Sequence, residues 1–126
     1  MADENTAPEN SVAENSTFDE QRKFPRVKTD VKVGILQSNG KMAYARIKNL
    51  SLGGIYVQAE YSADKGKKFQ VEFSLSIKEK MYKVIAQCKV VYIHYGSEEI
   101  VYLGMGFVKF KDDGKEKISE YIQTRL

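Results

Sequence analysis

The sequence predicts an all-β protein, a six-stranded antiparallel β-barrel with a C-terminal α-helix. From Val27 onward, apolar residues recur mostly at every second position, which is typical of strands with one buried face. Residues that favour turns separate these stretches, and only the C-terminal end changes to a helical period. Several short strands followed by one helix indicate a small closed barrel on which the helix packs.

The first two strands are expected to form a hairpin. In the first strand Val31, Val33 and Ile35 are the apolar members of a strict alternation. The triplet Ser38-Asn39-Gly40 indicates a turn, and residues 41–49 form the second strand.

The register of this hairpin follows from the side chains that each loop length would bring together. A two-residue Asn-Gly loop would place long cations on the apolar face. A three-residue loop with Gly40 in the left-handed region keeps that face apolar. It pairs Ile35 with Ala43, Val33 with Ala45, and Val31 with Ile47. Lys32 and Arg46 then face outward together, which requires a nearby anion or a splayed geometry.

Four further strands are expected at residues 54–59, 68–75, 82–95 and 101–110. The strand at 82–95 is long and is expected to bend across the barrel. One parity of this strand contains Tyr82, Val84, Ala86, Cys88, Val90 and Tyr92. The 8 Tyr and 6 Phe residues lie mostly at strand parity, so we expect them to serve the core first.

The terminal helix has both a start signal and an apolar stripe. Asp113, with Glu116 three residues later, resembles a capping box. Ile118, Tyr121 and Ile122 follow at helical spacing and predict the face that packs on the barrel.

Composition limits the classes of function. The 126 residues suit one domain, with no apolar run long enough for a membrane span and no signal-peptide pattern. The single cysteine, Cys88, has no partner for a disulfide or a Cys-based zinc site, so a cytoplasmic location is expected. With one histidine, His94, and no nucleophile–base pair, we expect no catalytic residues, no metal and no cofactor. The protein is therefore predicted to be non-enzymatic.

The net charge of +3 conceals two blocks of opposite sign. Residues 1–20 contain 6 acidic and no basic residues, whereas residues 21–126 contain 20 basic and 11 acidic residues, a net +9. The acidic tail, residues 1–19, has too few apolar residues to offset the entropy of ordering and is predicted to be disordered. The domain is predicted to span residues 20–126. Basic domains commonly meet anions, although scattered lysines often serve only as a solvated surface.

Two short motifs could bind an anion. Arg22-Lys23-Phe24-Pro25-Arg26 precedes the first strand, and Pro25 favours an extended conformation there. Asn49-Leu50-Ser51-Leu52-Gly53-Gly54 forms the turn before the third strand. Its Asn and Ser can simply cap the turn, whereas its glycines can adopt positive φ and offer backbone N–H groups to an anion. Neither motif is specific alone.

The order of these motifs resembles that of the PilZ domain family. An Arg-x-x-x-Arg segment, a hairpin and then Asn-x-Ser-x-x-Gly occur here in the family's order, and the likeness extends over about residues 20–126. Leu103-Gly104-Met105-Gly106-Phe107 resembles the family's late-strand pattern. A six-stranded barrel with a closing helix is also the fold that the family implies.

The resemblance implies binding of cyclic di-GMP, a bacterial second messenger, as a ligand rather than a cofactor. It places the ligand contacts at Arg22, Arg26, Asn49, Ser51, Gly53 and Gly54, with Lys23 and Gly104 as secondary candidates. An arginine fork can pair with guanine O6 and N7 or with a phosphate, and Asn49 can bind the guanine edge. Ser51 would donate to phosphate or base, and the two glycines would admit the ligand to the backbone. Arg46 and Lys48 lie outside the motif.

The position of the two arginines, between the tail predicted to be disordered and the first strand, predicts a switch. Ligand that bridges the arginines and the Asn49–Gly54 turn would fold the arginine segment over the barrel and present a new surface to a protein partner. Motility, exopolysaccharide, biofilm or virulence would be the output. Two alternatives remain open: a basic barrel that binds RNA or single-stranded DNA, which we expect less, and a PilZ-like protein-interaction module without nucleotide. Membrane insertion is not expected.

Overall fold

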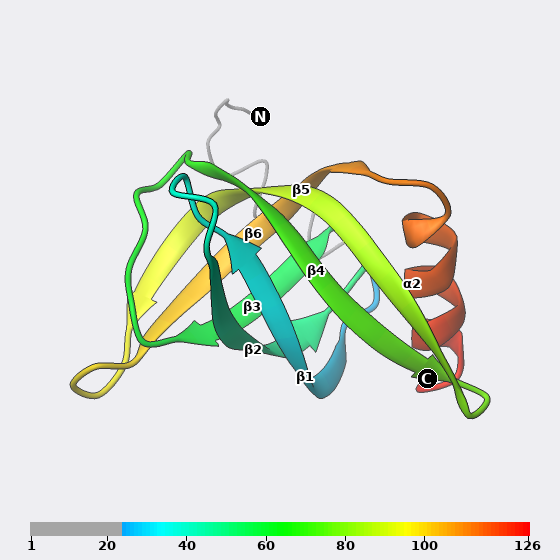
Figure 1. Ribbon diagram of the computed structural model, residues 1–126. Helices are drawn as coiled ribbons and strands as arrows, with labels where there is room; N and C mark the ends of the chain where they lie inside the picture. The colour runs from blue at the N-terminus through cyan, green and yellow to red at the C-terminus, as the bar shows by residue number, and fades with distance from the viewer. Residues whose placement is uncertain (1–23) are drawn as a thin grey trace, which may run out of the picture.

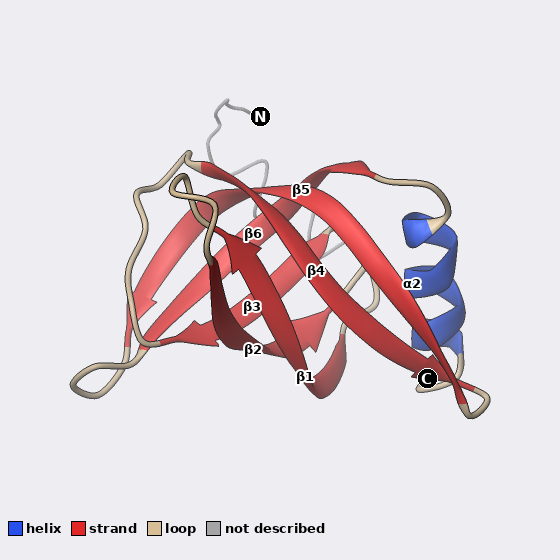
Figure 2. Cartoon of the chain, in the orientation of Figure 1, coloured by secondary structure: helices blue, strands red, loops and turns tan. Residues whose placement is uncertain are grey.

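The computed structural model describes residues 24–126. Six antiparallel strands close a barrel in the order β1-β2-β3-β6-β5-β4, and one helix, α2, lies beside it (Figures 1 and 2). The elements are β1 (Val27–Leu36), β2 (Met42–Leu50), β3 (Gly54–Ala59), β4 (Lys68–Ile77), β5 (Lys80–Tyr95), β6 (Val101–Phe110) and α2 (Gly114–Gln123). The predicted fold is therefore confirmed. The predictions for the tail, Arg22 and Lys23 lie outside the described residues.

The β1–β2 hairpin has the predicted register. Ile35 faces Ala43, Val33 faces Ala45 and Val31 faces Ile47. The loop closes through a hydrogen bond from the Gly40 amide to the Gln37 carbonyl at 2.9 Å, and Gly40 has a φ of +86°. The left-handed conformation of Gly40 thus sets which β2 residues point inward.

The barrel interior is filled mainly by aliphatic side chains. The largest fully buried ones on the strands are Ile35, Ile47, Leu50, Leu75, Leu103 and Met105. Cys88 is also fully buried, and this burial raises the pKa of its thiol to about 12. The thiol therefore stays protonated and packs as a small apolar group.

Strands β1 and β4 pair over a short seam only. Three residues of β1 face three of β4: Val33 faces Phe73, Gly34 faces Glu72 and Ile35 faces Val71. No further β1–β4 pairs occur among the described residues. Helix α2 packs where the two strands separate, and the Tyr121 hydroxyl is 2.6 Å from the Thr29 hydroxyl. A hollow of about 940 Å³ remains between β1, β4 and α2.

The terminal helix has the predicted apolar face but not the predicted cap. Ile118, Tyr121 and Ile122 are buried, as expected. Asp113 precedes the helix, yet its side chain makes no capping hydrogen bond, so the predicted capping box is wrong. Its backbone, at φ −95° and ψ 24°, lies outside the extended region that aims an N-cap side chain at the first-turn amides. No helix in the described part of the chain is long and apolar enough to cross a membrane.

Tyr92 was expected on the same side of β5 as Val90, and this expectation is wrong because β5 contains a β-bulge. Val90 faces Met105, but the next pair along is Tyr92 with Gly104, so Val91 is an extra residue. The bulge shifts the alternation by one position, and Tyr92 leaves the parity of the buried Val84, Ala86, Cys88 and Val90. It therefore shares the outer face of the barrel with Gly104.

Candidate functional site

The turn between β2 and β3 is held together by Ser51. This residue is only 4% exposed, and its hydroxyl oxygen accepts hydrogen bonds from the amides of Gly53 and Gly54 at 3.1 and 3.2 Å. The Ser51 amide in turn donates to the Gly54 carbonyl at 3.0 Å. The structure thus places Ser51 in the capping role that was the alternative to ligand contact.

The two glycines of this turn differ from the expectation. Among the described glycines only Gly40 and Gly66 have positive φ, so the expected left-handed geometry at Gly53 and Gly54 is wrong. Their amides point at Ser51 rather than into an anion-binding concavity. The physical reason is that the serine oxygen already satisfies both donors, and a turn closed in this way needs no unusual backbone angles.

The turn lies beside the second arginine of the motif. Arg26 is exposed just before β1 and lines one small cleft together with Asn49, Ser51 and Gly54. The hollow between them measures only about 20 Å³, room for roughly one water. The cleft is therefore too small to enclose a nucleotide. Arg22 and Lys23 lie outside the described residues.

Asn49 stands in a row of residues that crosses the outer face of the barrel. Lys28 faces Asn49 on β2, Asn49 faces Tyr56 on β3, Tyr56 faces Gly104 on β6, and Gly104 faces Tyr92 on β5. Directly opposed residues share a face of the sheet, so all five are exterior. Among the predicted site residues, the structure thus brings Arg26, Asn49, Ser51 and Gly54 to one cleft and Gly104 to the adjoining surface.

Three half-buried tyrosines on the outer face of the barrel adjoin the site, whereas aromatic residues in general were expected to serve the core first: Tyr56, Tyr92 and Tyr102. Tyr56 and Tyr102 stack with ring centroids 5.3 Å apart and an interplanar angle of 2°, and Tyr92 lies 6.0 Å from Tyr56. Burial raises the pKa of the Tyr56 hydroxyl, and neighbouring Tyr102 raises it further. A sequence signal did exist for two of them, because Tyr56 and Tyr102 alternate with buried aliphatic neighbours on their strands.

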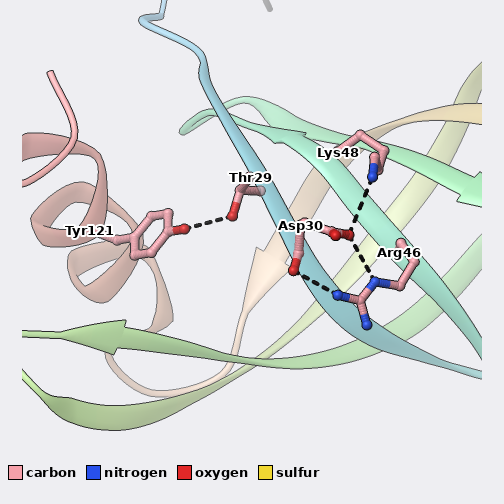
Figure 3. Close-up of polar contacts among 5 residues, drawn as sticks. All are labelled: Thr29, Asp30, Arg46, Lys48 and Tyr121. Carbon is pink, nitrogen blue, oxygen red and sulfur yellow. Dashed lines mark hydrogen bonds and ion pairs between the residues drawn. The ribbon is translucent and has the colours of Figure 1, made fainter.

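The outward cations of β2 are held by a carboxylate. Asp30 on β1 accepts a hydrogen bond from Nε of Arg46 at 2.9 Å and one from Nζ of Lys48 at 3.3 Å (Figure 3). Lys32, which faces Arg46, instead places its Nζ 4.4 Å from the centroid of the Tyr44 ring. The anion expected near Lys32 and Arg46 is thus supplied by the protein itself.

Asp30 gives a pH-dependent prediction. Hydrogen bonds from Arg46 and Lys48 hold the pKa of Asp30 below its usual value of 3.8. A lowered folded-state pKa stabilises the protein above the unfolded-state pKa, and this stabilisation is lost as the pH falls through the folded-state pKa. We expect Asp30→Asn to be slightly less stable than wild type at neutral pH, with the difference disappearing in acid. Urea unfolding across that pH range measures it, and a difference that grows toward low pH would contradict the assignment.

The described residues offer little for metal binding. No group of three or more His, Cys, Asp and Glu side chains in residues 24–126 is placed to hold a metal ion. His94 faces Tyr102 across β5 and β6, with ring centroids 6.0 Å apart. The groups that line the site are therefore the Arg26 side chain, the Asn49 side chain, the backbone of the Ser51 turn and tyrosine rings.

Comparison with known proteins gives a family and a set of related folds. The model of the PilZ domain matches residues 20–124. No match was found among curated proteins. MotI/DgrA, the inhibitor of motility of Bacillus subtilis, superposes with a TM-score of 0.73 at 19% identity, over 82% of this chain and 50% of that one.

Two structures of YcgR from Escherichia coli with cyclic di-GMP are also similar. One has a TM-score of 0.67 at 15% identity, over 82% of this chain and 45% of that one. The other, its PilZ domain, has a TM-score of 0.57 at 15% identity, over 83% of this chain and 91% of that one. This chain spans about half the length of MotI/DgrA and of the longer YcgR chain. At these identities the likeness concerns the fold.

Proposed function

Because this chain belongs to the PilZ domain family, we propose that it is a receptor for cyclic di-GMP and performs no chemistry on it. The observation that carries the proposal is the shared cleft of Arg26, Asn49 and the Ser51 turn, which unites residues from both sequence motifs. Structures of YcgR with cyclic di-GMP support the choice of ligand.

Each residue has a distinct task in this proposal. Arg22 and Arg26 pair with guanine edges or phosphates through their planar guanidinium groups. The side-chain amide of Asn49, which has no hydrogen-bond partner among the described residues, binds the guanine edge or orients an arginine. Ser51, Gly53 and Gly54 form a turn of small residues over which the ligand can approach the backbone.

The shallow cleft favours closure by the arginine segment. A hollow of about 20 Å³ cannot enclose a nucleotide, which supports a proposal in which residues 20–28 supply the second side of the binding site. Ligand would draw this segment onto the barrel, and the surface so formed would be recognised by a downstream protein. Lys23, next to Arg22 in the motif, is a secondary candidate for a ligand contact in this proposal.

Calorimetry on the full chain tests the proposal. We expect saturable binding of cyclic di-GMP and much weaker binding of GMP, together with slower amide exchange in residues 20–28 at saturation. No heat up to high micromolar cyclic di-GMP would contradict the receptor function and favour an interaction module. Sequence-tolerant binding of single-stranded RNA with steep salt dependence would instead indicate a nucleic-acid barrel. Unchanged exchange at saturation would reject the closure alone.

A further inference from the structure

A groove follows an exposed edge of β1 and shares no lining residue with the small cleft of Arg26 and Asn49. This groove is the hollow of about 940 Å³ between β1, β4 and α2, and five consecutive β1 residues, 28–32, line it. Because successive side chains of a strand point to opposite faces, a hollow that touches all five runs along the backbone edge of the strand. Only residues 33–35 of β1 pair with β4, so the edge at 28–32 has no strand partner there among the described residues. We refer to this hollow as the edge groove.

The edge groove contains cations that the barrel leaves without a counter-ion. Lys28, Lys32 and Arg125 line the groove and form no ion pair among the described residues. Arg125 instead places its Cζ atom 4.6 Å from the centroid of the Tyr121 ring. The two carboxylates that line the groove are already paired, Asp30 with Arg46 and Lys48, and Glu72 with Lys83 at 3.9 Å. An acidic segment therefore meets uncompensated positive charge along this edge of β1.

Exposed apolar side chains flank the edge groove on both sides. Tyr44 on β2 is 59% exposed and Met81 on β5 is 66% exposed, and both line the groove. In the barrel β2 is the neighbour of β1 and β5 is the neighbour of β4, so the two residues lie on opposite sides of the groove. An extended segment can add to an unpaired strand edge of this kind, because main-chain hydrogen bonds supply affinity and the flanking side chains supply selectivity. The edge groove thus fits an extended acidic segment.

The acidic tail has the charge and the point of attachment that the edge groove requires. Residues 1–20 contain 6 acidic and no basic residues, and neither binding motif includes any of them. The tail joins the barrel just before Val27, where β1 begins, and Pro25 favours a turn there. The connecting residues 21–26 span at most about 20 Å when extended, and a strand edge of five residues is about 17 Å long. The tail can therefore reach the whole of the edge groove.

We propose that the acidic tail docks in the edge groove as an extended segment along β1, with its carboxylates against Lys28, Lys32 and Arg125. A segment with so few apolar residues does not fold alone, but a charged surface can order it. Because the tail is tethered, its local concentration at the groove is on the order of millimolar, which favours it over an equally acidic segment of another protein. This inference goes beyond the proposed function, which involves neither the tail nor the groove.

A nitroxide label on the tail of the full chain tests the docking by NMR. Ala13→Cys provides the labelling site, and the native Cys88 does not react because its thiol is fully buried, with a pKa raised to about 12. At low salt the amide signals of residues 28–32 are expected to lose intensity by paramagnetic broadening. The signals of the loop at 97–99, which does not line the groove, are expected to keep theirs. Raising the ionic strength from about 0.01 M to about 1 M shortens the screening length from about 30 Å to about 3 Å, so most of the lost intensity should return.

Matched variants separate docking from the mere proximity of the tail to β1. The neutral-tail variant keeps the length of the tail but exchanges four carboxylates for amides: D3N, E4Q, E9Q and E14Q. We expect it to lose most of the broadening. Its control changes three uncharged tail residues and should keep the broadening: N5S, N10S and N15S. On the barrel, Lys32→Gln should reduce the broadening, whereas Lys65→Gln should not, because Lys65 is exposed and does not line the groove.

The outcomes that overturn the docking are distinct. No broadening at residues 28–32 at low salt overturns it, and so does equal broadening in the otherwise wild-type chain and the neutral-tail variant. A mixture of spin-labelled chains with separately isotope-enriched chains gives a further check. Broadening of equal strength in that mixture would assign the groove to the tail of a second copy and overturn the contact within one chain. No cyclic di-GMP is added, so the result is independent of the proposed function.

Discussion

Replacing Arg26 with alanine is expected to weaken the binding of cyclic di-GMP by about 1 to 3 kcal/mol, or roughly 5- to 150-fold. The guanidinium can donate two parallel hydrogen bonds to guanine or phosphate and can stack on a base, and alanine can do neither. Arg22→Ala is expected to have an effect of the same size, since both positions belong to the Arg-x-x-x-Arg motif. Calorimetric titration of each variant measures the loss.

The matched control for these variants is Arg46→Ala. Arg46 has the same side chain on a neighbouring strand, but its guanidinium is bonded to Asp30 through both Nε and Nη2, at 2.9 Å each. We therefore expect Arg46→Ala to change the affinity little. Arg26→Lys is informative as well, because it keeps the charge but loses the fork, so it should recover only part of the affinity. Equal losses in Arg26→Ala and Arg46→Ala would show that a general positive field attracts the ligand, and would contradict a specific arginine contact.

Replacing Tyr121 with alanine is expected to lower the free energy of unfolding by about 3 to 5 kcal/mol. The Tyr121 ring is only 1% exposed, and α2 packs it at the place where β1 and β4 separate. Its removal would leave a cavity there and would strand the Thr29 hydroxyl, which now lies 2.6 Å from that of Tyr121 (Figure 3). A loss of this size is a large part of the stability of an ordinary domain. Urea unfolding measures it.

Two variants show which part of Tyr121 matters. Tyr121→Phe keeps the packing and removes only the hydrogen bond to Thr29, so a loss of about 1 kcal/mol is expected. Tyr95→Ala is the exposed control, because Tyr95 is 68% exposed, and its effect should stay within about 0.5 kcal/mol. If Tyr121→Ala were no more destabilising than Tyr95→Ala, α2 would not be an integral part of the barrel.

The strands were predictable because apolar residues recur at every second position wherever a strand has one buried face and one solvent-exposed face. In the first hairpin this was enough to predict the register, since only the pairing of Val33 with Ala45 keeps cations out of the core. The helix was predictable from Ile118, Tyr121 and Ile122, because it too has one buried face, with apolar residues at helical spacing. Its cap was not, because a capping box depends on the backbone angles of Asp113 as well as on residue types.

The candidate site was only partly predictable. The motif residues Arg26, Asn49 and Ser51 were identified from their order in the chain, yet Ser51 turned out to hold its own turn. That outcome depends on the distance from its hydroxyl to two amides, which no residue pattern specifies. The outward position of Tyr56, Tyr92 and Tyr102 beside the motifs was not predicted, although the alternation of Tyr56 with buried neighbours indicated an outward ring.

The sequence by itself therefore determined the fold class, the family and the residues of the two motifs, because side-chain period and motif order are properties of the chain. Tertiary structure alone decided which surface adjoins these motifs. The extra residue at Val91 turns Tyr92 to the outer face, and closure of the barrel then places it in line with Gly104, Tyr56 and Asn49. The bulge shifts the alternation of side chains by one position, but Val90 and Val91 are both apolar, so the unpaired residue is identified only when the partner strand is in place.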